Sequence, residues 1–296
     1  MSLQNYTQPQ LSIDQQIQRL KSAGLNFRDE AGAKHQLSHI GYSRLKGYLY
    51  PLRQPGGKKF ISSANYEQAM EFYRFDAALR NLLLFYLGKV EVSIRTQISF
   101  VLCDICDPFW FSNPGNFRNG KRHTLILEAI QHEIRRSDDE GIVRFFNTYS
   151  DPIPPSWRIM EAISFGTVSK LYKELNAGLA RRQVAKCYGI SDTVMESWLH
   201  ALVYVRNICA HHSRLWNRNL RIKPLTPHKT RNKFLSSPAS TQNLYFILSI
   251  VIYFLQIIQP DNTFVLDFKK LLKTYSDIDT SAMGFPKNWE TEFLWQ

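Results

Sequence analysis

The chain has 296 residues, enough to bury a sizeable core as one large domain or two small ones. An apolar content of 44% excludes wholesale disorder. The chain carries 37 Lys and Arg against 25 Asp and Glu, a net charge of +12, which favours nucleic acid over a membrane as partner because phosphate contacts release counterions. The alternative is a basic protein with no polyanionic partner.

Neither a disulfide framework nor a metal site is predicted. Four cysteines in a chain of this length indicate free thiols in a reducing compartment, and one CxxC motif lacks the second that a zinc site needs. His35 and His39 lack a third ligand nearby, so we interpret them as structural. Residues 1–10 contain no apolar stretch of the kind that a secretory signal has, and the longest apolar run, residues 244–258, is too short to span a membrane. We expect a cytoplasmic protein without metal, cofactor or membrane partner.

In chain order, the pattern predicts mostly helices. Ser12 is a possible N-cap of a first helix with Ile13, Ile17 and Leu20 on one face. Residues 41–60 alternate tyrosines with basic residues and predict either a short hairpin or a helix end followed by a basic loop. Residues 66–103 form the longest helical pattern, with apolar residues throughout and an interruption at most at Gly88, so they predict two helices or a single long one.

The last elements are also helical. A helix is expected from Thr193, with Thr193 as N-cap and Glu196 completing a capping box. Its core-facing stripe consists of Val194, Trp198, Leu202, Val205 and Cys209. Loops are predicted at residues 113–116, 151–155 and 224–240, and a buried core helix at 244–258. The fold class is mostly α, with a basic and aromatic segment (1–60) packed on a helical domain (61–223), and a basic loop and core helix (224–296) in that same domain.

The helix from Thr193 ends in the string Arg206-Asn207-Ile208-Cys209-Ala210-His211-His212. Histidine can transfer protons near neutral pH, and arginine can bind a phosphate through two hydrogen bonds. Arg206 lies at the edge of the buried stripe, so it needs a phosphate or a carboxylate as partner. Asn207 and His211 are four residues apart and can meet, but Arg206 and His211 point about 140° apart on a straight helix. Either the helix ends or bends near Cys209, or a homodimer completes the site.

There is a structural alternative for the same residues. Arg206 would then form a buried salt bridge, and the histidines would cap the end of the helix, where a positive charge is favoured. Glu91 and Arg95 have two readings as well. They are four residues apart and could bridge each other, which we favour, or Glu91 could orient Arg206 while Arg95 contacts RNA.

The string YVRNICAHHSRLWN at residues 204–217 resembles the signature of the Abi-like family of bacterial abortive-infection proteins, AbiD/AbiF type, within the HEPN superfamily. Further blocks are similar to those of the family in the same order. They are IGYSRLKGYLYP (40–51), YRFD (73–76), VEVSIRTQ (90–97), PFW (108–110), PSW (155–157) and SFGTVS (164–169).

The resemblance implies a HEPN-type helical bundle that pairs into a dimer and cleaves RNA without metal, through attack of the RNA's own 2′-OH. His211 would be the general base or acid, with His212 as second candidate, Arg206 would stabilise the phosphorane, and Asn207 would orient His211 or the phosphate. The expected role is a growth-arresting toxin in phage defence, with a structured noncoding RNA as plausible regulator. A non-catalytic RNA-binding module and a protein-interaction subunit of a defence complex are the alternatives.

Basic and aromatic side chains outside the string are candidates for RNA contact. A run of charges is more often a solvated face, but for Arg53, Lys58 and Lys59 we favour phosphate contact, with the neighbouring tyrosines in the core. The candidates are Arg53, Lys58, Lys59, Arg214, Trp216, Arg218 and Arg221.

Overall fold

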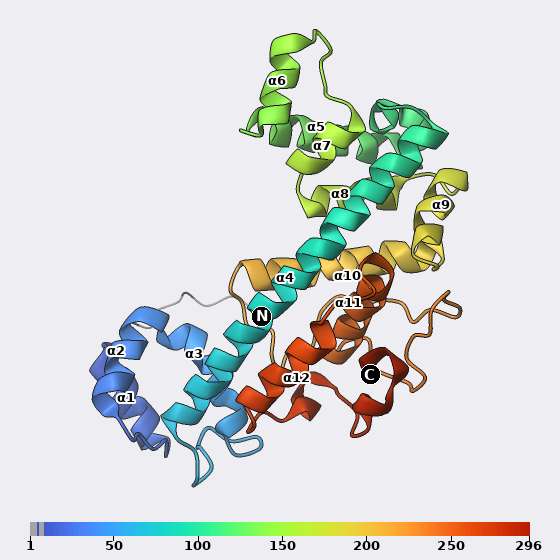
Figure 1. Cartoon of the computed structure of the whole chain (residues 1–296). Coiled ribbons are helices and arrows are strands. Elements are labelled where there is room, and N and C mark those ends of the chain that lie inside the picture. The colour runs from blue at the N-terminus through green and yellow to red at the C-terminus, as the bar shows by residue number, and fades with distance from the viewer. Residues whose placement is uncertain (1–4, 6–8) are drawn as a thin grey trace. The chain divides into compact units, whose positions relative to one another are not determined.

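The computed structural model describes residue 5 and residues 9–296, and this part of the chain is all-α, with three isolated β-bridges and no named strand (Figure 1). The predicted mostly-α fold class is confirmed. Most of residues 1–10, where no secretory signal was expected, lies outside the described residues. The helices are α1 (Ile13–Ser22), α2 (Glu30–Ile40), α3 (Tyr42–Leu49), α4 (Tyr66–Ile105), α5 (Gly120–Arg135), α6 (Glu140–Thr148), α7 (Ser156–Ala162), α8 (Phe165–Glu174), α9 (Leu179–Cys187), α10 (Asp192–Ala210), α11 (Leu244–Ile258) and α12 (Phe264–Thr274).

The chain forms two compact units. The first extends to residue 79 and includes residues 271–278, and the second comprises residues 80–270 and 279–296. Helix α4, 40 residues long and continuous in Figure 1, contributes residues 66–79 to the first unit and the rest to the second. Of the two alternatives for this region, the single long helix is confirmed. The domain boundaries predicted at residues 60 and 223 stay predictions.

In the first unit, α1 begins as its sequence predicts. Ser12 is the N-cap, and its hydroxyl accepts from the Gln15 amide at 3.2 Å while the Gln15 side chain accepts from the Ser12 amide at 2.8 Å. Ile17 and Leu20 are buried, so the predicted apolar face is confirmed. Residues 41–60 form α3, a 3₁₀ turn and a loop, which confirms the helix end. The two ends of the loop are joined by one antiparallel bridge, between Arg53 and Phe60, so the segment also contains a short hairpin-like turn.

In the second unit, α10 lies between the other helices and contacts α8, α9 and α11. Trp198 on α10 is fully buried against Phe234, Tyr253 and Phe254. Its indole nitrogen donates to the Leu225 carbonyl at 2.8 Å, which satisfies the one polar atom of a buried ring. Helix α11 is buried from Leu244 to Leu255, so the predicted core helix is confirmed.

The end of the chain packs onto this core through aromatic rings. Trp295 stacks on Tyr245 at a centroid distance of 5.6 Å, and its indole nitrogen donates to Ser249 Oγ at 3.0 Å. Glu292 is buried beside these rings, and its carboxylate accepts from the Ser236 amide at 2.9 Å, the Ser236 hydroxyl at 2.7 Å and the Ser237 amide at 3.0 Å. One carboxylate therefore ties the C-terminal segment to the long loop before α11.

These bonds predict a pH-dependent contribution to stability. Burial alone would raise the pKa of Glu292, but the hydrogen bonds from Ser236 and Ser237 outweigh it and lower the pKa from 4.5. A lowered pKa means that the folded state favours the ionised form, so this stabilisation is present at neutral pH and lost as the pH falls below about 4.5. Glu292→Gln should lower the free energy of unfolding at pH 7 by about 2 kcal/mol, measured by urea unfolding. The difference from wild type should shrink in acid.

Glu290→Gln is the matched control, because the Glu290 side chain is largely exposed. An equal loss of stability in both variants, or a Glu292→Gln effect that persists unchanged at low pH, would contradict this role of the carboxylate.

Candidate functional site

Helix α10 begins two residues before the predicted start. Ser191, not Thr193, is the N-cap, and its hydroxyl accepts from the Val194 amide at 3.3 Å. The predicted Thr193–Glu196 capping box is therefore wrong. Glu196 instead accepts from Arg181 Nη2 at 2.5 Å. The buried Arg181 needs a carboxylate, and this requirement takes precedence over a local cap.

The predicted core-facing stripe of α10 is confirmed, since Val194, Trp198, Leu202, Val205 and Cys209 are all buried. Arg206 lies at its edge, as expected, with 39% of its side chain exposed. Its Nε atom is 3.4 Å from Glu91 Oε2 on α4, and Nη1 donates to Asn207 Oδ1 at 3.4 Å. The partner required for Arg206 is thus a carboxylate within the chain, and the side chain of Arg206 stays partly exposed.

The other oxygen of Glu91 is held by a second arginine. Arg95 Nε and Nη2 donate to Glu91 Oε1 at 3.1 and 2.5 Å, while Arg95 Nη1 donates to the carbonyls of Met160 and Ile163 at 2.5 and 2.7 Å. The Glu91–Arg95 bridge that we favoured is confirmed. In the other reading, Glu91 orients Arg206 while Arg95 contacts RNA. Glu91 does lie beside Arg206, whereas Arg95 is only 8% exposed, so the structure gives no support to its contact with RNA. The two carbonyls, near the end of α7, have no signature in the sequence.

Helix α10 ends just before the two histidines. Ala210 is its last residue and His211 its C-cap, which confirms the first alternative for the string, a helix end near Cys209. His212 has a φ of +55°, and its amide donates to the Cys209 carbonyl at 3.0 Å, while the Ser213 amide donates to the Ile208 carbonyl at 3.0 Å. This is a Schellman motif with histidine in the left-handed position that glycine usually occupies. Both histidines are exposed.

The residues after the histidines hold the next turn together. Arg214 Nη1 donates to the Asn217 carbonyl at 2.7 Å, and Arg218 Nη1 donates to the Arg214 carbonyl at 3.1 Å. Trp216 is 3% exposed, so the prediction that it stacks on a base is wrong; an apolar ring next to a buried leucine, Leu215, belongs to the core. Arg221 is exposed, and RNA contact by the three arginines stays a prediction.

The other candidates for RNA contact belong to the first unit. The Arg53 guanidinium lies 5.4 Å from the centroid of the Phe60 ring, and Lys58 and Lys59 are exposed. Their RNA-binding role stays a prediction.

Among the described residues, 5 and 9–296, no group of three or more His, Cys, Asp or Glu side chains could hold a metal ion. His35 and His39 lie ring against ring, 4.7 Å between centroids. In the same part of the chain, Cys103, Cys106, Cys187 and Cys209 form no disulfide bond. No helix in the described part of the chain is long and apolar enough to cross a membrane.

The structure is that of an all-α protein. Glu91 on the long helix α4 pairs with the partly exposed Arg206 on α10, about one helical turn before the two exposed histidines, His211 and His212. The family model described as Abi-like protein matches residues 35–217, and the chain belongs to this family. Membership indicates a role in abortive infection, a bacterial defence against phage. Comparisons with curated proteins and with solved structures found no match.

Proposed function

We propose that this protein is a metal-independent endoribonuclease of the HEPN type, a toxin of abortive infection. The observation that carries the proposal is the anchored guanidinium of Arg206, which pairs with Glu91 in a side chain that is still 39% exposed, on the same helix end as His211 and His212. Arginine held in place before substrate arrives loses little freedom when it binds a phosphate.

The charges around Glu91 suit an anion. Two guanidinium groups, from Arg95 and Arg206, share one carboxylate, so one positive charge is left over. Arg95 is buried and satisfied by two backbone carbonyls, whereas Arg206 lies at the surface. The surplus charge is therefore available at Arg206, where an RNA phosphate could meet it.

The proposed reaction is a transesterification. His211 takes the proton of the 2′-OH as its oxygen forms a bond to the adjacent phosphorus, and Arg206 stabilises the negative charge of the phosphorane. The bond from phosphorus to the 5′ oxygen then breaks, and that oxygen receives a proton from His212 or from solvent. The products are a 2′,3′-cyclic phosphate and a 5′-OH, with no water consumed. Asn207, which accepts from Arg206, orients the guanidinium or the phosphate.

A second candidate function is a non-catalytic RNA-binding module, in which Arg206 serves only as a phosphate clamp. The ion pair to Glu91 and the net charge of +12 support this alternative as well. A structured noncoding RNA that restrains the toxin would be a partner under the first function.

Cleavage of RNA in EDTA separates the two functions. We expect the purified chain to cut labelled single-stranded RNA or tRNA but not DNA of the same sequence, because DNA has no 2′-OH to attack. RNA that is bound at saturation and stays intact, while binding weakens steeply with salt, would favour the binding module. Equal cleavage of RNA and DNA would contradict the proposed chemistry.

A further inference from the structure

One side of α10, in the second unit, carries a line of polar side chains that ends at the candidate site. The line consists of His200, Tyr204, Asn207 and His211. Their spacing of four, three and four residues places them within about 60° of one another around the helix, at about 100° per residue. Both histidines are exposed, and Tyr204 and Asn207 are partly exposed. The line is about 16 Å long, at about 1.5 Å per residue. Since a stacked strand rises about 3.4 Å per nucleotide, the line has room for several nucleotides.

The chain around this line is basic. Residues 197–260 contain eight Lys and Arg and no Asp or Glu. The two acidic residues of α10, Asp192 and Glu196, precede this stretch, and both bind the buried Arg181, at 3.0 and 2.5 Å. From Ser197 onward α10 therefore has no carboxylate that would repel a phosphate, and a polyanion is the partner that this charge fits.

Tyr204 supplies a phenol ring to the line, and an arginine lies at its hydroxyl. Arg218 Nη2 is 3.5 Å from the Tyr204 hydroxyl oxygen, and Arg218 Nη1 donates to the Arg214 carbonyl at 3.1 Å. The guanidinium thus meets the hydroxyl end of the ring. A partly exposed aromatic ring beside a cation is the combination on which a base stacks while its phosphate is bound.

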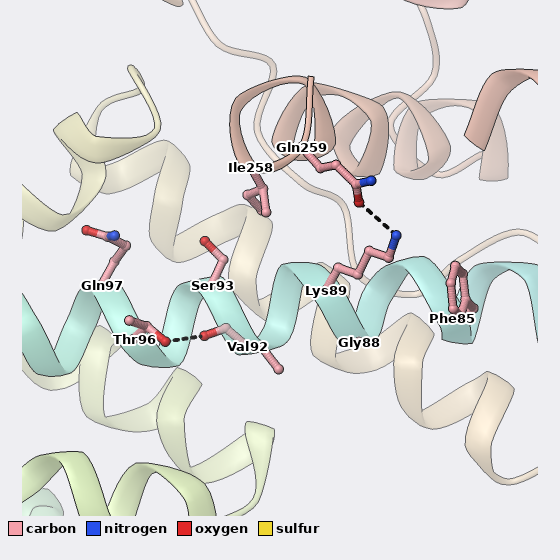
Figure 2. A pocket seen from close by; sticks show the side chains of 9 residues that line it. All are labelled: Phe85, Gly88, Lys89, Val92, Ser93, Thr96, Gln97, Ile258 and Gln259. Carbon is pink, nitrogen blue, oxygen red and sulfur yellow. Dashed lines mark hydrogen bonds between the residues drawn. The ribbon is translucent and has the colours of Figure 1, made fainter. Parts of the chain in front are cut away.

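The groove on α4 offers a different surface to RNA. It has a volume of about 740 Å³ between α4 and the end of α11, and Phe85, Lys89 and Gln259 are among the residues that line it (Figure 2). The Lys89 ammonium donates to Gln259 Oε1 at 2.8 Å and lies over the Phe85 ring, 4.7 Å from its centroid. The cation and the ring that a nucleotide would need are therefore engaged with each other, which favours α10 over this groove.

We propose that an RNA strand runs from the candidate site along α10, and that the base next to the phosphate at Arg206 stacks on Tyr204. This inference rests on the proposed function, from which it takes the phosphate at Arg206. Asn207 joins the two parts, because it accepts from Arg206 at 3.4 Å and lies between Tyr204 and His211 on the line.

Stacking on Tyr204 defines the class of substrate. A base inside a duplex is covered on both faces by its neighbours, so only an unpaired base can lie against the ring. The substrate is therefore single-stranded RNA, or a loop or bulge of a structured RNA. Tyr204 acts as a positioning residue, since a stacked base fixes the sugar and the phosphate next to it.

Binding of two RNA strands of equal length, oligoadenylate and an abasic ribose-phosphate strand, tests the proposal. Fluorescence anisotropy is measured in the His211→Ala background, where RNA stays intact. Tyr204→Ala should weaken oligoadenylate binding roughly 5- to 100-fold and leave binding of the abasic strand nearly unchanged. Tyr204→Phe keeps the ring and should bind both strands like its parent. Arg218→Ala should weaken both strands alike, because both carry phosphates.

Tyr149→Ala is the matched control, since Tyr149 is 58% exposed just after α6, and it should change neither affinity. The strands also give a test without any change at Tyr204. The His211→Ala chain should bind oligoadenylate more tightly than the abasic strand, and equal affinities would overturn the proposal. Equal weakening of both strands in Tyr204→Ala would also overturn it, and so would a Tyr204→Phe chain that binds as weakly as Tyr204→Ala.

The proposed nuclease fails in a different way. A wild-type chain that cuts no RNA, in which Tyr204→Ala still weakens oligoadenylate alone, would contradict the cleavage mechanism and support this path of the strand.

Discussion

His211→Ala should lower the rate of RNA cleavage roughly 10²- to 10⁴-fold while leaving the fold and RNA binding largely intact. The reason is that His211 would transfer the proton of the 2′-OH, yet its ring is exposed and its backbone amide alone caps α10. Single-turnover cleavage at saturating enzyme, with circular dichroism and RNA affinity measured on the same preparation, separates a loss of chemistry from a loss of structure.

His212→Gly is the companion variant. Glycine suits the left-handed backbone at this position, with its φ of +55°, so the Schellman motif should stay closed. If His211 is the essential group, His212→Gly should reduce cleavage far less than His211→Ala. Cleavage that survives in the double variant would refute a histidine mechanism at this site.

Glu91→Gln should destabilise the protein, by about 3 kcal/mol in the free energy of unfolding, and should also reduce cleavage. Glutamine keeps the shape but not the charge, so the buried guanidinium of Arg95 loses its counterion and Arg206 loses its alignment. Urea unfolding and single-turnover cleavage of the same variant measure the two effects.

Arg206→Ala distinguishes the two arginines that share Glu91. Since Arg206 is half exposed, its removal should cost less than about 1 kcal/mol of stability, yet it should reduce cleavage and phosphate-dependent binding strongly. Equal, small stability losses in Glu91→Gln and Arg206→Ala would show that Arg95 does not need the carboxylate. A stable Arg206→Ala variant with full activity would remove Arg206 from the mechanism.

Much of the fold follows from local patterns. The Ser12 cap, the apolar stripe of α10 and the buried run of α11 are confirmed because each depends on periodicity or capping within a few residues. The start of α10 was misplaced because Ser191 and Thr193 are both good caps, and the choice between them depends on Glu196 pairing with the distant Arg181.

The site was predictable in part. The edge position of Arg206 on α10 predicted that this side chain needs a partner. In the structure the partner is Glu91, 115 positions earlier in the chain (206 less 91). Only the tertiary fold brings two residues so far apart into contact. The carbonyls of Met160 and Ile163 that bind Arg95 are backbone groups and have no residue signature. Trp216 was misread because an aromatic ring among arginines resembles a stacking platform, whereas its burial is decided by the packing of the turn.

The exposure of one side of α4 in the second unit could not be read from the sequence. Apolar residues recur throughout residues 66–103, between charged residues such as Glu91 and Arg95, so the pattern alone does not show which side is covered. Only the exposed fractions of Phe85, Val92 and Phe100 decide that one side of it is open within the single chain.

The chemistry of the product ends, after incubation of RNA in EDTA with wild type and with His211→Ala, decides whether this protein is a metal-independent ribonuclease that uses His211. We expect fragments with 2′,3′-cyclic phosphate and 5′-OH ends from wild type and intact RNA from the variant. Fragments with 5′-phosphate ends, or cleavage by His211→Ala at the wild-type rate, would contradict it.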